Sequence, residues 1–202
     1  MMYQKFFKRL LDIVLSMIGI AALSWLMLVI AILVKLTSKG PIIFKQERLS
    51  RNGDTFKMYK FRSMVVGAEK QGVYADNNDP RLTPIGKMIR ATSIDELPQL
   101  FNIFKGDMSF VGPRPILTYH PWPFDQYTDS QKQIFDVRPG ITGWAQVNGR
   151  KEVQWEQRIA LNIWYVQNIS FLLDMKIIVM TIQKVLLMKN NQNVGETVEK
   201  SS

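Results

Sequence analysis

The sequence contains no cysteine and a single histidine, His120, in 202 residues. The absence of cysteine excludes disulfides, thiolate metal sites and a cysteine nucleophile. A single histidine excludes metal sites built from several histidines and argues against an imidazole-based catalytic triad. If the protein uses a metal ion, carboxylates and substrate oxygens must hold it, which favours a hard cation such as Mg²⁺.

Charge is absent from one long stretch near the N-terminus. No charged residue occurs in the 22 positions from 13 to 34. As a helix, this run is about 33 Å long, which is enough to cross a bilayer core of about 30 Å. It is longer than the apolar core of a signal peptide, and residues 35–39 make a poor cleavage region. We therefore expect residues 1–39 to form a retained, membrane-associated helical segment.

The charges around this run favour a hairpin over a spanning helix, although the spanning helix remains an alternative. The chain has 26 lysines and arginines against 17 aspartates and glutamates, a net charge of +9. Cations flank the run on both sides: Lys5, Lys8 and Arg9 before it, and Lys35, Lys39, Lys45, Arg48 and Arg51 after it. Cationic flanks prefer the cytoplasmic face, so a re-entrant helix satisfies both flanks. The run contains no proline, and Gly19 and Ser24 are therefore the available positions for a bend.

Residues 40–188 are expected to form a compact, helix-rich α+β domain on the cytosolic side. Strand-like residues 42–44 and 55–59 flank Asn52-Gly53, which is a hairpin signal. Thr83-Pro84 is typical of a helix start. Further helices are predicted over residues 97–104, where Gly106 ends the helix, and over residues 153–168 and 171–188. The remaining predictions are a mobile loop over residues 69–81, a turn-rich region over residues 110–149 and a polar tail over residues 189–202.

The last predicted helix is amphipathic but heavily apolar, so two interpretations stay open. It can be a core helix, or it can lie in the membrane interface and seat the domain there. The amphipathic residues 1–11 also suit a headgroup surface. Interface-lying amphipathic helices are therefore part of the expected architecture.

Asp95 and Glu96 are the main candidates for chemistry. Ser93 and Glu96 have the spacing of a capping box, which is the structural alternative, but Pro98 would then remove a helical hydrogen bond. If Asp95 is the N-cap instead, Pro98 falls where the backbone N–H is unpaired anyway. At a helix start, free N–H groups keep a carboxylate ionised and also bind phosphate. An ionised aspartate can attack phosphorus and form an acyl-phosphate.

Cations near turn-rich segments indicate an anionic substrate. Arginine's planar guanidinium suits phosphate. The candidate phosphate-binding residues are Lys60, Arg62, Arg90, Arg114 and Arg138. For most single arginines a solvated surface position is the alternative. Nucleic acid is the competing anion, but the sequence has no zinc knuckle, RNA-binding aromatic motif or basic heptad helix. It also lacks the usual glycine-rich phosphate loops.

Five stretches of the chain resemble the bacterial sugar transferase family, whose small members are monotopic phosphoglycosyl transferases. They are GPIIFKQER (40–48), YKFRSM (59–64), SIDELPQLFN (93–102), GDMSFVGPRP (106–115) and RPGITGWAQVNGR (138–150). The resemblance runs over about residues 6–187 with the motifs in order. It implies transfer of a sugar 1-phosphate from a UDP-sugar to undecaprenyl phosphate, with release of UMP, which starts the assembly of a bacterial glycan.

The resemblance also implies roles for individual residues. Asp95 would be the nucleophile that carries the phospho-sugar and a ligand of Mg²⁺, and Glu96 would complete the pair. Phosphate or substrate binding would fall to Lys60, Arg62, Arg90, Arg114, Arg138 and Arg150. The implied partners are a UDP-sugar, undecaprenyl phosphate and inner-membrane lipids, with a homodimer allowed and no nucleic acid. The implied location is the bacterial cytoplasmic membrane, with the catalytic domain on its cytosolic face.

The sequence departs from the family pattern at two places. Ser24-Trp25 stands where the family usually has Ser-Pro at the bend, which bears on the re-entrant prediction. Asn162 stands where the family often has aspartate, so no role is assigned to position 162, and the role of Asp174 stays open. A membrane-tethered scaffold without turnover is the alternative from another functional class, and the intact Asp95-Glu96 pair argues against it.

Overall fold

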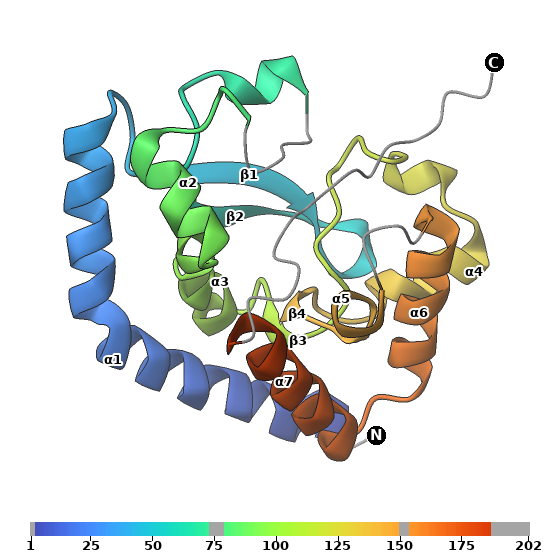
Figure 1. Ribbon diagram of the computed structural model, residues 1–202. Helices are drawn as coiled ribbons and strands as arrows, with labels where there is room; N and C mark the ends of the chain where they lie inside the picture. Colours follow the sequence, from blue (N-terminus) through green and yellow to red (C-terminus); the bar gives the residue numbers. More distant parts are fainter. Residues whose placement is uncertain (1–2, 73–78, 150–153, 187–202) are drawn as a thin grey trace.

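The computed structural model describes residues 3–72, 79–149 and 154–186 (Figure 1). The helices are α1 (Lys8–Thr37), α2 (Pro84–Ala91), α3 (Gln99–Lys105), α4 (Asp129–Lys132), α5 (Trp144–Asn148), α6 (Trp155–Gln167) and α7 (Phe171–Leu186). The strands are β1 (Ile43–Leu49), β2 (Thr55–Phe61), β3 (Ser109–Val111) and β4 (Gly140–Thr142). The α+β class, rich in helix, is therefore confirmed. Outside the described residues lie residues 73–78 of the predicted loop, residues 150–153 with Arg150, and residues 187–202, which include the predicted tail over 189–202.

The predicted hairpin is present, and its strands are longer than predicted. β1 and β2 pair antiparallel, from Ile43 opposite Phe61 to Leu49 opposite Thr55. The connection uses left-handed backbone at Asn52 (φ 59°) and Gly53 (φ 83°), which is the conformation that an Asn-Gly turn supplies.

Local signals place α2 and the end of α3 correctly. The Thr83 side chain accepts a hydrogen bond from the Gly86 N–H at 3.0 Å, with Pro84 in the first turn of α2. Gly106, at φ 101°, ends α3 as predicted. α3 packs against the inner face of β2 through a buried cluster of Phe56, Met58, Leu100, Ile103 and Met108.

A second, smaller sheet lies almost entirely within the region predicted to be turn-rich, where no strand was predicted. β3 and β4 pair in parallel, with Ser109 opposite Gly140 and Val111 opposite Thr142. The two backbones approach closely at Gly140, where an added Cβ would lie 2.1 Å from the Gly112 nitrogen. This pairing brings together the two segments with the densest family-like motifs in the C-terminal half of the chain.

Helix α1 is long and apolar enough to cross a membrane, and Figure 1 shows that it changes direction about midway along its length. Among the proposed weak points, the Ser24 hydroxyl donates to the Ala21 carbonyl at 2.9 Å, a bond that is associated with helix bending. The rest of the chain lies on the inner side of this bend (Figure 1). Met27, Ile30 and Val34 of the C-terminal half pack with Phe61 and Ile89.

The N-terminal half of α1 is tied to the domain by polar contacts. Lys8 and the hydroxyl of Tyr165 both donate to Asp174, which is 1% exposed. Arg9 donates to the carbonyls of α3 residues 103 and 104 at 2.6 and 2.7 Å. Asp12 accepts from the Ser109 hydroxyl and the Phe110 N–H, both at 3.0 Å. Asp174, whose role the sequence left open, is therefore an anchor for α1.

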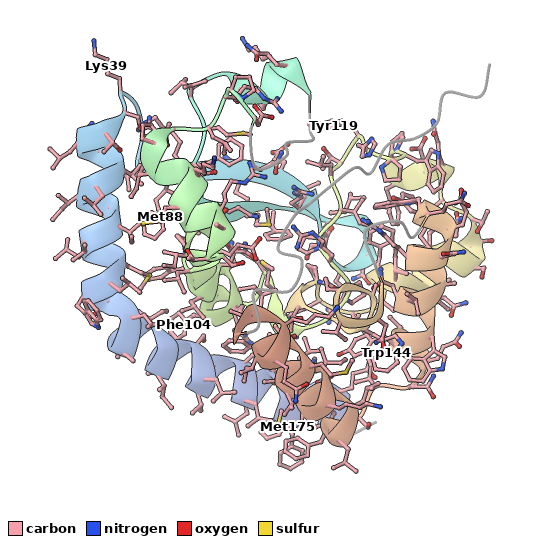
Figure 2. All side chains as sticks on the ribbon, in the orientation of Figure 1. Lys39, Met88, Phe104, Tyr119, Trp144 and Met175 are labelled. Atoms are coloured by element: carbon pink, nitrogen blue, oxygen red, sulfur yellow. The ribbon has the colours of Figure 1, made fainter. Side chains whose placement is uncertain are left out.

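The outer side of α1 and part of α7 expose apolar side chains (Figure 2). Leu28 and Leu36 of α1 are 63% and 77% exposed, and Leu172 of α7 is 78% exposed. Ile177 of α7 is fully buried. One face of the last helix is therefore part of the core, as one interpretation predicted, and another face is apolar and exposed. Its placement in the membrane interface stays a prediction.

Candidate active site

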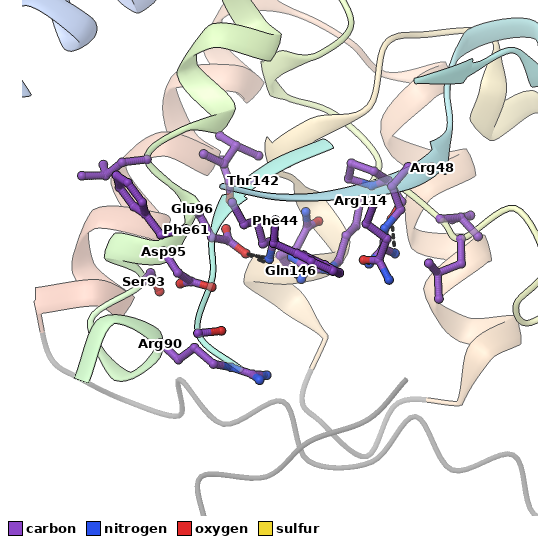
Figure 3. A pocket seen from close by; sticks show the side chains of 18 of the residues that line it. Phe44, Arg48, Phe61, Arg90, Ser93, Asp95, Glu96, Arg114, Thr142 and Gln146 are labelled. Atoms are coloured by element: carbon purple, nitrogen blue, oxygen red, sulfur yellow. Dashed lines mark hydrogen bonds and ion pairs between the residues drawn. The ribbon is translucent and has the colours of Figure 1, made fainter. Parts of the chain in front are cut away.

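A cavity of about 1630 Å³ lies between the hairpin, the α2–α3 junction, α5, α6 and α7, and it contains the Asp95–Glu96 pair. Figure 3 shows these two carboxylates with Arg90, Arg114 and Gln146 in the same space. Residues of α1 and α7 also line it, including Leu15, Ile18, Leu23, Ile178 and Ile182. The cavity thus joins a charged region to an apolar one.

The Asp95–Glu96 pair stands in a 3-10 turn, Ile94–Glu96, and not at the N-cap of α3 as predicted. Ser93 has left-handed backbone (φ 58°) and its side chain makes no capping hydrogen bond to the turn, so the capping-box alternative is also wrong. Pro98 is the N-cap of α3. The left-handed residue separates α2 from a new turn, and this turn places the two carboxylates before α3 begins.

Two cations face Glu96. Lys60 Nζ lies 2.6 Å from Glu96 Oε1, and Arg114 Nη2 lies 3.8 Å from the same oxygen. The Glu96 side chain is 22% exposed. Burial favours its neutral form, but the charges of Lys60 and Arg114 outweigh that effect and hold the pKa of Glu96 well below its usual range. Glu96 is therefore ionised and fixed in place.

Asp95 lies in a different electrostatic environment, although it is the adjacent residue. It is 7% exposed, and among the described residues none donates a hydrogen bond to its carboxylate. Burial is the main cause that raises the pKa of Asp95 to about 6, and the nearby Glu96 charge acts in the same direction. Lys60, Arg90 and Arg114 oppose the rise. The Asp95 carboxylate is ionised at neutral pH but poorly stabilised, which suits a nucleophile.

The structure separates the predicted phosphate-binding cations into two groups. Lys60, Arg90 and Arg114 line the cavity beside the carboxylates. Arg62 also borders the cavity, but it is 4% exposed and donates to the carbonyls of Ser38 and Lys39 at 2.7 and 2.6 Å, so its guanidinium caps the C-terminal end of α1. Arg138 is absent from the cavity lining and donates to the Gly106 carbonyl at 2.9 Å. These two arginines therefore have backbone carbonyls as partners, and their predicted role in substrate binding stays a prediction.

Sequence reasoning missed the neutral polar lining of the cavity, notably Gln146 and Asn162. The sequence did contain a pattern that corresponds to one wall of the cavity. Residues Trp155, Arg158, Ile159 and Asn162 of α6 all line the cavity, and their spacing is that of a single helix face. The residue types and their spacing could not show whether this helix face borders a cavity or packs in the core.

The carboxylates of the site could bind a hard metal ion only if a substrate supplied further oxygen ligands. Within the described ranges, no group of three or more His, Asp and Glu side chains could hold a metal ion. Asp95 offers an oxygen without a hydrogen-bond donor, whereas Lys60 already occupies one Glu96 oxygen. Mg²⁺ is commonly bound through one or two carboxylates plus substrate phosphates. Asp95 fits that donor set.

Comparisons with known proteins show which family the sequence matches. A family model described as bacterial sugar transferase matches residues 3–188. The protein named uncharacterized sugar transferase EpsL of Bacillus subtilis (strain 168) is 44% identical over 93% of this chain and 91% of that protein. A UDP-glucose:undecaprenyl-phosphate glucose-1-phosphate transferase of Klebsiella pneumoniae is 43% identical over 91% of this chain and 41% of its own length.

A UDP-N-acetylgalactosamine-undecaprenyl-phosphate N-acetylgalactosaminephosphotransferase of Aeromonas hydrophila is 43% identical over 90% of this chain and 44% of its own length. The chain therefore spans less than half of each of these two transferases, but nearly all of the Bacillus protein. The family match extends from the residues before α1 to the end of α7 and so includes every described part of the cavity. The chain belongs to the bacterial sugar transferase family.

Proposed function

We propose that this protein transfers a sugar 1-phosphate from a UDP-sugar to undecaprenyl phosphate and so starts the assembly of a bacterial glycan. The observation that carries the proposal is the position of Asp95. A buried carboxylate without a hydrogen-bond donor shares one cavity with Lys60, Arg90 and Arg114, and the same cavity continues to apolar residues of α1 and α7. An anionic nucleotide and a lipid phosphate can therefore reach the same carboxylate.

The reaction has two displacement steps. An Asp95 carboxylate oxygen attacks the β-phosphorus of the UDP-sugar, the bond from that phosphorus to the bridging oxygen breaks, and UMP leaves with that oxygen. The sugar phosphate is then held on Asp95 as an acyl-phosphate. A phosphate oxygen of undecaprenyl phosphate attacks the same phosphorus, which frees the carboxylate and gives the diphosphate-linked sugar.

The neighbouring side chains bind charge and orient the reactants. Arg90 and Arg114 line the cavity and present planar forks that can hold phosphate oxygens. Lys60 is held by Glu96 and lowers the charge repulsion between Asp95 and an incoming diphosphate. Glu96 thus acts by fixing Lys60 and Arg114 beside the nucleophile.

Asp95 is the residue that would hold Mg²⁺, together with diphosphate oxygens of the substrate. When bound, the ion neutralises phosphate charge and makes phosphorus easier to attack. Because the substrate would supply the other oxygen ligands, one protein carboxylate is sufficient at this site.

We place the protein at the cytoplasmic membrane, with the domain on the cytosolic face where UDP-sugars are made. In this arrangement α1 is re-entrant, and its exposed apolar side chains together with those of α7 contact lipid. The bend in α1 and the cations that flank it support a helix that enters and leaves on one side.

The test uses purified protein, Mg²⁺ and a panel of UDP-sugars with undecaprenyl phosphate. At least one UDP-sugar should release UMP and form a lipid-linked sugar diphosphate. Without the lipid acceptor, labelled UMP should exchange into the UDP-sugar, because the first step is reversible through the aspartyl intermediate. Turnover without exchange would contradict the covalent route, and no UMP release from any UDP-sugar would contradict the function itself.

A further inference from the structure

Two carboxamide side chains in the cavity have buried polar atoms without hydrogen-bond partners. Both amide atoms of Gln146 are in this state, as is Oδ1 of Asn162. Asn162 is 6% exposed, and both side chains line the cavity that contains Asp95. Buried polar groups in folded proteins are paired in the great majority of cases. Unpaired amide atoms of two side chains at the same cavity therefore indicate a polar ligand that pairs them.

The packing of α5 on α6 explains why both amides face inward. Trp144 of α5 and Trp164 of α6 stack with their ring centroids 4.8 Å apart, and Trp164 is 42% exposed. Gln146 follows Trp144 by two residues and Asn162 precedes Trp164 by two. Two residues correspond to about 200° around a helix. The amides therefore leave their helices on the side opposite the stacked tryptophans, towards the cavity.

The neutral charge of these side chains indicates which part of a substrate they meet. Phosphates have cationic partners in Lys60, Arg90 and Arg114, whereas carboxamides match uncharged groups that both donate and accept. Figure 3 shows Gln146 among the labelled side chains of the cavity that also holds Asp95, Glu96 and Arg114. Under the proposed function, the group attached directly to the reacting phosphorus is the sugar, whereas uracil is separated from it by a second phosphate and a ribose.

We infer that Gln146 and Asn162 form a neutral subsite that hydrogen-bonds the hydroxyl or acylamino groups of the transferred sugar. This inference rests on the proposed function and assigns the residues that select the sugar. Aromatic side chains suited to a base lie elsewhere on the cavity wall, where the His120 and Trp155 rings are 6.4 Å apart. Trp155 is two turns of α6 from Asn162, which leaves room between base and sugar.

The test compares Gln146→Met and Asn162→Leu, which keep the side-chain size and remove the amide, with Gln167→Met as the matched control. Gln167 is exposed on α6 and pairs with Gln133. Equilibrium binding of UMP and of UDP-glucose, UDP-galactose, UDP-N-acetylglucosamine and UDP-N-acetylgalactosamine is measured for each protein, with thermal unfolding alongside. UMP release by the wild-type protein is measured separately and tests the proposed function by itself.

The two variants should bind the preferred UDP-sugar at least tenfold more weakly, bind UMP within twofold of wild type, and change the ranking of the four sugars. Their unfolding midpoints should stay unchanged or rise, because an unpaired buried amide is replaced by an apolar group of similar shape. The control should match wild type throughout. Equal losses for UMP and UDP-sugar would assign the amides to the nucleotide and overturn the inference. Unchanged sugar binding, or weaker binding that follows a lower unfolding midpoint, would overturn it as well.

Discussion

At the scale of single residues, Asp95 is expected to favour activity at the expense of stability. Its raised pKa means that the folded protein binds a proton at Asp95 more readily than the unfolded chain does, so ionisation near neutral pH disfavours folding. Asp95→Asn should therefore abolish UMP release and exchange while the unfolding midpoint stays equal or rises. Activity assays and thermal unfolding in the same detergent check both parts, and wild-type rates in purified Asp95→Asn would refute the nucleophile assignment.

Glu96→Gln is the matched variant for comparison, since its expected effect on stability has the opposite sign. The pKa of Glu96 is lowered from 4.5 to about 2, so its charge stabilises the fold above pH 4.5, and that contribution is lost progressively as the pH falls between these two values. Glu96→Gln leaves Lys60 without its carboxylate partner. Activity should fall severely and the unfolding midpoint should fall as well, in contrast to Asp95→Asn.

The pH dependence of activity should follow Asp95. Since the nucleophile must be ionised and its pKa is about 6, the rate of UMP release should rise with pH through that region and level off above it. Glu96 is already ionised across this range and should not contribute a second acidic limb. A pH–rate profile of wild type from pH 5 to 8 checks this, and a flat profile across pH 6 would contradict it.

Substitution of Arg114 distinguishes a requirement for positive charge at this position from a requirement for the planar guanidinium group. Its side chain is 41% exposed, lines the cavity and lies near Glu96. Arg114→Lys keeps the charge but loses the planar fork, so it should fold normally and lose at least tenfold in kcat/KM for the UDP-sugar. Activity within twofold of wild type would show that Arg114 does not hold a phosphate through paired hydrogen bonds.

The residues of the charged part of the cavity could be predicted in part from sequence. The prediction identified Asp95, Glu96, Lys60, Arg90 and Arg114, which the structure brings together. It failed to separate them from Arg62, because an arginine in a basic strand looks the same whether its partner is a substrate phosphate or a carbonyl at a distant helix end. Only the tertiary approach of α1 to β2 decides between these partners.

At the scale of elements, Arg62 ties the end of α1 to the hairpin. It is buried and donates to carbonyls of the residues that follow the last turn of α1. Arg62→Met should leave these carbonyls unpaired and lower the free energy of unfolding by about 2–4 kcal/mol, which is roughly 5–15 °C in the unfolding midpoint. Lys57→Met, on the exposed face of the same strand, is the control and should change the midpoint little.

The elements that could be predicted are those with local signals. Asn52-Gly53 fixed the hairpin and Thr83-Pro84 the start of α2, because turn and cap chemistry act within a few residues. The β3–β4 pair was missed because each strand has three residues and its partner lies about 30 positions away in sequence. The turn that holds Asp95 was misplaced because the left-handed backbone of Ser93 is rare outside glycine and asparagine.

At the scale of the whole molecule, the topology of α1 decides where the N-terminus lies. A single cysteine in place of Gln4, which is exposed in this cysteine-free chain, can be tested with a membrane-impermeant thiol reagent on intact cells. The re-entrant form predicts protection until the cells are lysed, because both ends of α1 then face the cytosol. A cysteine in place of Ser170, between α6 and α7, marks the domain side and should be protected in either topology. Labelling of the Gln4 position in intact cells would mean that α1 spans the bilayer.

The bonds that tie α1 to the domain at both of its ends have a consequence for how the acceptor is found. Lys8, Arg9 and Asp12 bind one end of α1 to the domain, and Arg62 binds the other end. These bonds hold the domain in one orientation relative to α1. The height of Asp95 above the plane defined by the outer side of α1 is therefore constant. Under the proposed seating, the search for undecaprenyl phosphate becomes a two-dimensional one. Encounter should then follow the surface density of the lipid and the viscosity of the leaflet, and not its concentration per volume of suspension.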